Sequence, residues 1–279
     1  MIKTVDFFGN QITRMTIGDN PFHGNTYIHD IYTWHDMMDY YTADKCVQAL
    51  FEAEENGINT FIALASPFTL RVIHQYQNEG GKMHIMFQTY PAMDLEININ
   101  QLMYYKPIAI YHQGSTFDDM YETGQIDLLH KRLKLIRDTG VITGFATHLP
   151  EVVMRAEEEK WDVDFYKTCL YNTRRTQRGE KSGFITGKTK QLVMYHEDRL
   201  LMLNAIKKVS KPCIAFKIFA GGQVFINKSG DDIAAAAETA IKQTFENIKP
   251  NDFVCIGVFQ RDKNQIKENC DITKKVLGE

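Results

Sequence analysis

The chain has 279 residues, of which 44% are hydrophobic and 24% are charged, a composition typical of a folded globular protein. Its 32 basic and 35 acidic residues give a net charge of −3, which lacks the positive excess that a dedicated nucleic-acid-binding protein needs. No apolar run approaches the roughly 20 residues that cross a bilayer, and the first residues lack the apolar core of a signal peptide. We therefore expect a cytoplasmic protein with neither a nucleic acid nor a membrane as its partner.

Short apolar runs alternate with longer amphipathic stretches, the pattern of strand and helix units around a parallel sheet. At the N-terminus, the turn dipeptide Gly9-Asn10 predicts a hairpin over residues 1–14. Further strands are predicted at residues 15–19, 60–64, 84–89, 108–112, 142–147, 165–170, 213–219 and 253–259. Helices are predicted at residues 43–56, 69–77, 95–103, 126–138, 150–159, 196–209, 231–248 and 262–277.

Eight strands, each followed by a helix, predict a (β/α)8 TIM barrel, with the hairpin closing the barrel floor. A doubly wound open sheet is the alternative. No linker divides the chain, so residues 1–279 are predicted to form one domain. Residues 172–191 are rich in Arg and Lys without apolar periodicity, and we expect this long basic loop to cover the barrel mouth and to become ordered around an anionic ligand.

Reactive groups of such barrels lie at the C-terminal ends of the strands and in the loops that follow. The polar residues predicted there, as substrate-binding or catalytic groups, are Asp19, Asn20, His23, Gln88, His112, Gln113, His148, Asn172 and Lys217.

Two of these residues are predicted to be catalytic and to face one cavity. His112 follows an apolar run and titrates near neutral pH, so it suits an acid, a base or a carbonyl polariser, although a hydrogen-bonded core histidine would fit the same pattern. Lys217 lies within a predicted strand. If it faces the barrel interior, desolvation would lower its pKa and make it a nucleophile; if it faces outward, it would only extend between helices. The strand period alone leaves this orientation open.

Metal and phosphate sites are weaker possibilities. His23, His112 and His148 lack any HxH or HExxH spacing, so no metal is predicted. Gly221-Gly222 follows the seventh barrel strand, where it would either let backbone amides approach a phosphate or merely turn the chain.

Several segments, in order and spacing, resemble the aldo-keto reductase superfamily over nearly the whole chain. They are FGNQITRMTIG (8–18), GIN (57–59), IAIYH (108–112), RDTG (137–140), GFATH (144–148) and QIKEN (265–269). Members of that superfamily are (β/α)8 barrels with an N-terminal hairpin, and they bind a nicotinamide dinucleotide without a Rossmann domain.

The resemblance implies roles for a few residues. His112 matches the family's catalytic histidine, and Glu268 and Asn269 match its adenine-contacting pair. If a cofactor binds, the glycine turn at Gly221 and Gly222 is the expected phosphate contact. However, Phe68 and Gln88 stand near the positions of the family's catalytic tyrosine and lysine. Because phenylalanine cannot donate a proton, the usual reductase mechanism is not expected.

The expectation is therefore a divergent aldo-keto-reductase-like enzyme that acts on a small polar carbonyl or sugar-like substrate, with or without a phosphate group. In this reading the reaction is of lyase or isomerase type, His112 exchanges protons, and Lys217 forms an imine or stabilises negative charge. The alternatives are an NAD(P)H-dependent oxidoreductase with a substituted catalytic tetrad and a ligand-binding barrel without catalysis. The sequence leaves the substrate and the oligomeric state open.

Overall fold

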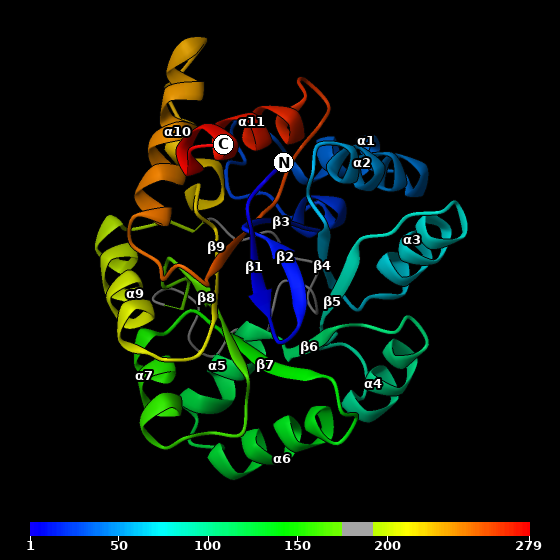
Figure 1. The fold of residues 1–279 in the computed structure, drawn as a ribbon, viewed down its shortest axis with the longest axis vertical. Coiled ribbons are helices and arrows are strands. Elements are labelled where there is room, and N and C mark those ends of the chain that lie inside the picture. Colours follow the sequence, from blue (N-terminus) through cyan, green and yellow to red (C-terminus); the bar gives the residue numbers. More distant parts are fainter. Residues whose placement is uncertain (175–191) are drawn as a thin grey trace.

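A computed structural model describes residues 1–174 and 192–279. Eight parallel strands close into a barrel in the order β10-β3-β4-β5-β6-β7-β8-β9, surrounded by helices (Figure 1). The predicted (β/α)8 barrel is therefore confirmed, and the open-sheet alternative is wrong. The barrel strands are β3 (Met15–Gly18), β4 (Thr60–Leu64), β5 (His84–Gln88), β6 (Ala109–His112), β7 (Ile142–Thr147), β8 (Phe165–Cys169), β9 (Cys213–Phe216) and β10 (Phe253–Ile256).

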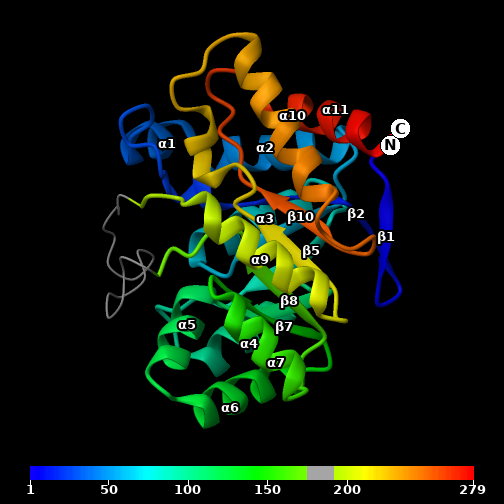
Figure 2. The same cartoon turned by 90° about the vertical axis from the view of Figure 1, so that its left-hand side faces the viewer.

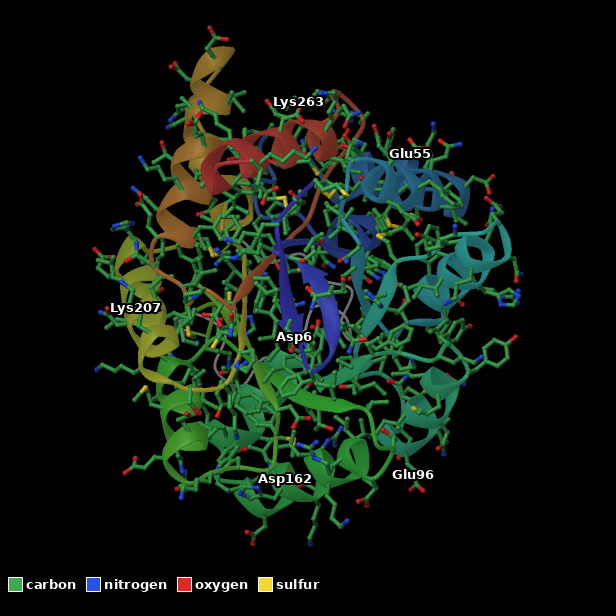
Figure 3. All side chains as sticks on the ribbon, in the orientation of Figure 1. Asp6, Glu55, Glu96, Asp162, Lys207 and Lys263 are labelled. Carbon is green, nitrogen blue, oxygen red and sulfur yellow. The ribbon has the colours of Figure 1, made fainter. Side chains whose placement is uncertain are left out.

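The helices pack their apolar faces against the outside of this barrel. The α-helices are α1 (Trp34–Tyr40), α2 (Ala43–Glu55), α3 (Pro67–Asn78), α4 (Leu95–Met103), α5 (Gly114–Glu122), α6 (Ile126–Arg137), α7 (Pro150–Glu158), α9 (His196–Lys208), α10 (Asp231–Phe245) and α11 (Gln265–Leu277). Two 3-10 helices, η1 (Asn20–His23) and η2 (Ala220–Phe225), follow β3 and β9. Charged side chains such as Glu55, Asp162 and Lys207 point outward from the helical layer (Figure 3).

The N-terminal hairpin closes the barrel floor, as predicted. Strands β1 (Thr4–Phe7) and β2 (Asn10–Thr13) pair antiparallel, and Figure 2 shows them at the end of the barrel opposite α1. The buried ring of Phe7 lies 5.3 Å from the ring of Phe165 and 5.4 Å from that of Phe253, measured between centroids. These edge-to-face contacts fill the bottom of the barrel with aromatic side chains.

Alternate residues of each strand fill the barrel interior, because side chains on a strand point to opposite faces. Met86, Tyr111, Ala146 and Phe165 belong to the interior cluster. Their neighbours, among them Ile110 and Tyr166, pack against the helices instead. This register decides which polar residues reach the barrel mouth.

The predicted elements differ from the observed ones at several boundaries; for example, β10 ends at Ile256 rather than at residue 259. Strand β9 ends at Phe216 rather than at residue 219, because Lys217 adopts a left-handed φ of 59° that breaks the extended backbone. Helices α1 and α5 were not predicted.

No described helix combines the length and the apolar composition that a bilayer crossing requires. Of the predicted basic loop 172–191, residues 175–191 lie outside the described residues.

Candidate functional site

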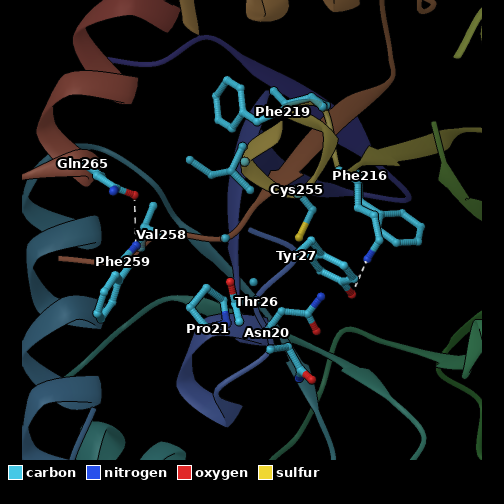
Figure 4. A pocket seen from close by; sticks show the side chains of 18 of the residues that line it. Asn20, Pro21, Thr26, Tyr27, Phe216, Phe219, Cys255, Val258, Phe259 and Gln265 are labelled. Atoms are coloured by element: carbon cyan, nitrogen blue, oxygen red, sulfur yellow. Dashed lines mark hydrogen bonds between the residues drawn. The ribbon is translucent and has the colours of Figure 1, made fainter. Parts of the chain in front are cut away.

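A cavity of about 310 Å³ opens at the C-terminal ends of the barrel strands. It is lined by strand ends, by the segment of residues 25–28 that follows η1, and by residues of η2, α10 and α11. Figure 4 shows the side chains of Tyr27, Phe216 and Cys255 around it. Of the residues predicted for the site, those that line the cavity are Asp19, Asn20, Gln88, Lys217, Gly221, Gly222, Glu268 and Asn269.

Lys167 and Tyr111 lie at the centre of this site, and the sequence analysis missed both. The Nζ atom of Lys167, on β8, donates a hydrogen bond of 2.6 Å to the phenolic oxygen of Tyr111, on β6. Both side chains line the cavity, and their residues are only 6% and 1% exposed. Tyr111 also donates to Oε1 of Gln88 at 3.4 Å.

The surroundings change the protonation of both groups. Burial lowers the pKa of Lys167, and the nearby positive charge of Lys217 lowers it further. Burial raises the pKa of Tyr111 well above its ordinary value, so its phenol stays protonated at neutral pH. The pair therefore combines an amine that loses its proton readily with a proton donor.

Lys217 faces the same cavity, which answers the orientation question that its strand left open. Its Nζ atom donates a 2.8 Å hydrogen bond to the phenolic oxygen of Tyr27 (Figure 4) and lies 4.2 Å from the centroid of that ring. Burial acts to lower the pKa of Lys217, but charge interactions with Tyr27 and Cys169 and the hydrogen bond to Tyr27 outweigh burial, and the pKa is raised. The expected lowering of this pKa is therefore wrong, because the phenol oxygen and the aromatic ring favour the ammonium form.

Asp19 is a buried carboxylate at the end of β3 whose Oδ2 atom is already used. Oδ2 accepts hydrogen bonds from the backbone N–H of Leu64 at 2.7 Å and from the hydroxyl of Thr69 at 3.2 Å. Nε2 of His23 lies 3.0 Å from the same oxygen. Asp19 and His23 thus tie η1 to the strand ends, and His23 does not line the cavity.

His112 does not face the cavity, so the expectation that His112 and Lys217 share one site is wrong. Because Tyr111 points into the barrel, the next residue of β6 points toward the helices. The ring of His112 is buried beside that of Phe117, and its Nε2 atom accepts a 2.9 Å hydrogen bond from Nε of Arg132. Burial, with the charge of Arg132, lowers the pKa of His112 to about 3.

His148, Gln113 and Asn172 also lie outside the cavity lining. Nδ1 of His148 lies 2.7 Å from Oδ2 of the fully buried Asp118. The side chain of Gln113 caps α5 by accepting from the backbone N–H of Thr116. Asn172 accepts from the backbone N–H of Arg174. Each of these side chains holds a loop or a helix end in place.

The three histidines considered as metal ligands each contact a different side chain: Asp19 for His23, Arg132 for His112 and Asp118 for His148. Among residues 1–174 and 192–279, no group of three or more His, Cys, Asp or Glu side chains is arranged to hold a metal ion.

The two glycines of η2 are explained by packing. A Cβ atom on Gly221 would lie 2.7 Å from the ring of Tyr27, and one on Gly222 would lie 2.9 Å from Cδ1 of Ile28. The missing side chains therefore make room for the 25–28 segment, which supports the turn reading over a phosphate cradle. At the far side of the cavity, Glu268 is paired with Lys263 at 2.6 Å.

The residues that the sequence analysis missed left weak signals. Lys167 interrupts a strand that is buried on both faces, and a fully buried lysine is rare. Its position two residues after Phe165 places both on the same face of β8. Tyr27 lies in a segment without periodicity, so nothing in the sequence connects it with Lys217.

The fold resembles those of several solved structures. An aldo-keto reductase from Bacillus halodurans in its holo form superposes with a TM-score of 0.61 at 10% identity, over 98% of this chain and 91% of that chain. An aldo/keto reductase from Brucella melitensis gives 0.54 at 14% identity, over 98% and 93%. A dihydropteroate synthase from Yersinia pestis, in complex with a sulfonamide drug, gives 0.55 at 10% identity, over 99% and 98%.

Neither a family model nor a curated protein matches the sequence. At identities this low, the structural likeness shows the fold alone. The similar structures include both aldo-keto reductases and a dihydropteroate synthase. The chain is therefore a TIM barrel of the kind found in enzymes, with aldo-keto reductases among the structures it resembles.

Proposed function

We propose that this protein is an enzyme that acts on small polar carbonyl compounds through an imine on Lys167. The observation that carries this proposal is the position of the Lys167 amine in the cavity, 2.6 Å from the phenol of Tyr111. Lysines activated by desolvation or by a neighbouring cation form Schiff bases with carbonyl substrates. Lys167 has both a buried position and the neighbouring charge of Lys217.

The chemistry follows from the two groups. The neutral amine of Lys167 adds to the carbonyl carbon, and the resulting carbinolamine loses its hydroxyl group as water to give an iminium ion. Tyr111, whose phenol is protonated, is placed to supply the proton that this water needs. An iminium draws electrons from an adjacent C–C or C–H bond, which suits a lyase or an isomerase, and hydrolysis returns the free lysine.

This proposal revises the expected roles. Lys167 replaces Lys217 as the imine-forming residue, because its pKa is lowered whereas that of Lys217 is raised. Tyr111 replaces His112 as the proton donor, because His112 faces the helices. Asn20 and Gln88 remain available in the cavity lining to orient a polar substrate.

Borohydride trapping tests the proposal. The protein is incubated with glyceraldehyde, dihydroxyacetone, hydroxyacetone, pyruvate and sugar phosphates, reduced with borohydride, digested and examined by mass spectrometry. We expect an adduct on the peptide that contains Lys167, lost in Lys167→Met and retained in Lys131→Met, which changes an exposed lysine of α6. The absence of any adduct, or equal labelling of Lys167 and exposed lysines, would contradict the proposal. Binding of a carbonyl compound without an adduct or turnover would favour the ligand-binding barrel.

A second candidate is an NAD(P)H-dependent oxidoreductase. It is favoured by the phenol and amine of Tyr111 and Lys167, which could together protonate a carbonyl, and by Glu268 and Asn269, which line the same cavity. Those two residues of α11 would contact the adenine, and the bound nicotinamide would supply the hydride. Stabilisation by NADPH in a thermal-shift measurement, with consumption of NADPH in the presence of aldehydes, would support this candidate. Stabilisation by carbonyl compounds alone would support imine chemistry.

A further inference from the structure

The two lysines of the cavity have different surroundings, and we infer that Lys217 binds an anionic group of the substrate while Lys167 reacts with its carbonyl. The inference rests on the proposed function and deepens it. It defines the substrate class as a carbonyl compound with a phosphate or a carboxylate group.

The contacts of the Lys217 ammonium group within the described residues are with aromatic rings and a phenol. Its Nζ atom lies 4.2 Å from the ring centroid of Tyr27 and 5.5 Å from that of Phe216, and its hydrogen bond goes to the Tyr27 phenol. Within the described part of the chain, no carboxylate forms an ion pair with it. Aromatic rings stabilise a cation without neutralising it, so the charge remains available to an anion.

The wider cavity also has an excess of positive charge. Besides the neutral amine of Lys167, the charged residues that line it, within the described ranges, are three lysines, Lys217, Lys228 and Lys263, and two carboxylates, Asp19 and Glu268. Glu268 is neutralised by Lys263 at 2.6 Å. Oδ2 of Asp19 accepts from the backbone of Leu64 and from Thr69. Within the described residues neither carboxylate forms an ion pair with Lys217, and a substrate anion would fill that role.

The strained backbone of Lys217 and the side-chain amide of Asn25 also support an anion site in this cavity. Lys217 has a φ of 59°, a conformation that costs energy in a residue with a side chain and that persists mainly where the surrounding structure requires it. Asn25, which also lines the cavity, has a buried Nδ2 atom that finds no hydrogen-bond partner among residues 1–174 and 192–279. A buried amide N–H without an acceptor is costly, and a ligand oxygen would satisfy it.

The protonation of the two lysines supports this division. The pKa of Lys217 is raised, so its ammonium is charged at neutral pH, whereas that of Lys167 is lowered. An anion-binding group needs the charged form, and an imine-forming amine needs the neutral form.

Matched pairs of carbonyl compounds test the inference. Glyceraldehyde is compared with glyceraldehyde 3-phosphate, and hydroxyacetone with pyruvate, by the concentration that gives half-maximal borohydride adduct on Lys167. We expect the anionic member of at least one pair to need a concentration about tenfold lower. The pair with the larger preference identifies phosphate or carboxylate as the group bound. Equal concentrations within both pairs in the wild-type protein would overturn the inference and leave the proposed function standing.

Variants then assign the preference to one residue. Lys217→Met should remove the preference, so that the anionic and the neutral member of a pair need similar concentrations, while Lys217→Arg and Lys131→Met should keep it. An unchanged preference in Lys217→Met would assign the anion to another group and overturn the inference. An adduct on Lys217 in place of Lys167 would reverse the two roles and overturn it as well.

A measurement that needs no imine separates this inference from the proposed function. If no carbonyl compound gives an adduct, the proposed function is wrong, and the anion site is tested by itself with inorganic phosphate. We expect phosphate to raise the melting temperature of the wild-type protein and of Lys167→Met, but not that of Lys217→Met. Equal effects of phosphate on all three proteins, or no effect on any, would contradict the anion site.

Discussion

Lys167 and Tyr111 meet across the strand that separates them. Strand β7 lies between β6 and β8 in the barrel, yet 2.6 Å separates Nζ of Lys167 from the phenolic oxygen of Tyr111. The residues of β7 in register with them are Gly144, opposite Tyr111, and Ala146, opposite Lys167. Gly144 has no side chain and Ala146 only a methyl group, so β7 contributes no long side chain at these two positions. A Cβ atom on Gly144 would lie only 2.6 Å from the ring of Phe165.

The pH dependence of imine formation should report the charge of Lys217. Because burial and Lys217 lower the pKa of Lys167, the rate of adduct formation with a neutral carbonyl should level off at a lower pH than for an ordinary lysine. In Lys217→Met the neighbouring cation is lost, so the midpoint should move upward. Initial trapping rates from pH 6 to 10 give both midpoints, and identical midpoints would show that the two lysines do not interact.

Tyr111→Phe tests whether the phenol of Tyr111 is needed for the reaction of Lys167 with a carbonyl compound. The variant keeps the ring in the barrel but removes the phenol that donates a proton and accepts from Lys167. We expect adduct formation to slow by about 100-fold and the free energy of unfolding to fall by about 1–3 kcal/mol. Tyr104→Phe, at a tyrosine that is 70% exposed, is the matched control. Unchanged trapping rates in Tyr111→Phe would exclude the phenol as the proton donor.

His112 should contribute to acid sensitivity rather than to catalysis. Its pKa is lowered from 6.5 to about 3 in the folded protein, so as the pH falls below 6.5 the unfolded chain gains a proton that the folded chain does not. The free energy of unfolding therefore decreases by about 1.4 kcal/mol per pH unit as the pH falls from 6.5 toward 3. Between pH 7 and pH 5, the wild-type protein should lose about 2 kcal/mol more than His112→Gln.

Urea unfolding at the two pH values measures that difference. His35→Gln, at an exposed histidine, should follow the wild-type protein. Equal losses in the wild-type protein and His112→Gln would show that this histidine is not held neutral. Loss of the Lys167 adduct in a folded His112→Gln variant would restore a catalytic role to His112.

The barrel was predictable because its signals are repeated. Each apolar run with its following amphipathic stretch adds to the same pattern, so errors in single boundaries, such as the end of β9 at Phe216, do not change the fold. Helix α5 was missed because it is short and directly precedes α6, so the two read as one connection with one helix.

The site was less predictable because barrel strands are buried on both faces and show no alternation of polar and apolar residues. Without that alternation, the sequence did not reveal that Tyr111 faces the interior and His112 the helices. A shift of one residue exchanges the two faces. The strand ends were nevertheless located well enough to place Asp19, Gln88 and Lys217 at the cavity.

Gly221→Ala should disturb the anion site through Tyr27. Gly221 has a φ of 61°, and a Cβ atom there would lie 2.7 Å from the Tyr27 ring, which must then shift and change its contact with Lys217. Gly140→Ala is the matched control, because Gly140 has a φ of 79° and nothing lies within 4 Å of a Cβ atom there. Both variants place alanine in a left-handed conformation, at a cost of about 1–2 kcal/mol. Only Gly221→Ala also displaces Tyr27, so we expect it to lose more stability.

The half-maximal concentrations of anionic and neutral carbonyl compounds in borohydride trapping show whether Tyr27 helps or hinders anion binding by Lys217. If Tyr27 holds the ammonium in place, Gly221→Ala should raise the half-maximal concentration for the anionic carbonyl several-fold and leave that for the neutral one unchanged. Gly140→Ala should change neither value. If Tyr27 instead competes with the substrate for Lys217, Gly221→Ala should lower the anionic value, because the hydrogen bond to the phenol no longer has to be broken. Identical values in Gly221→Ala and Gly140→Ala would mean that Lys217 keeps its position without Tyr27, held by the left-handed backbone at the end of β9.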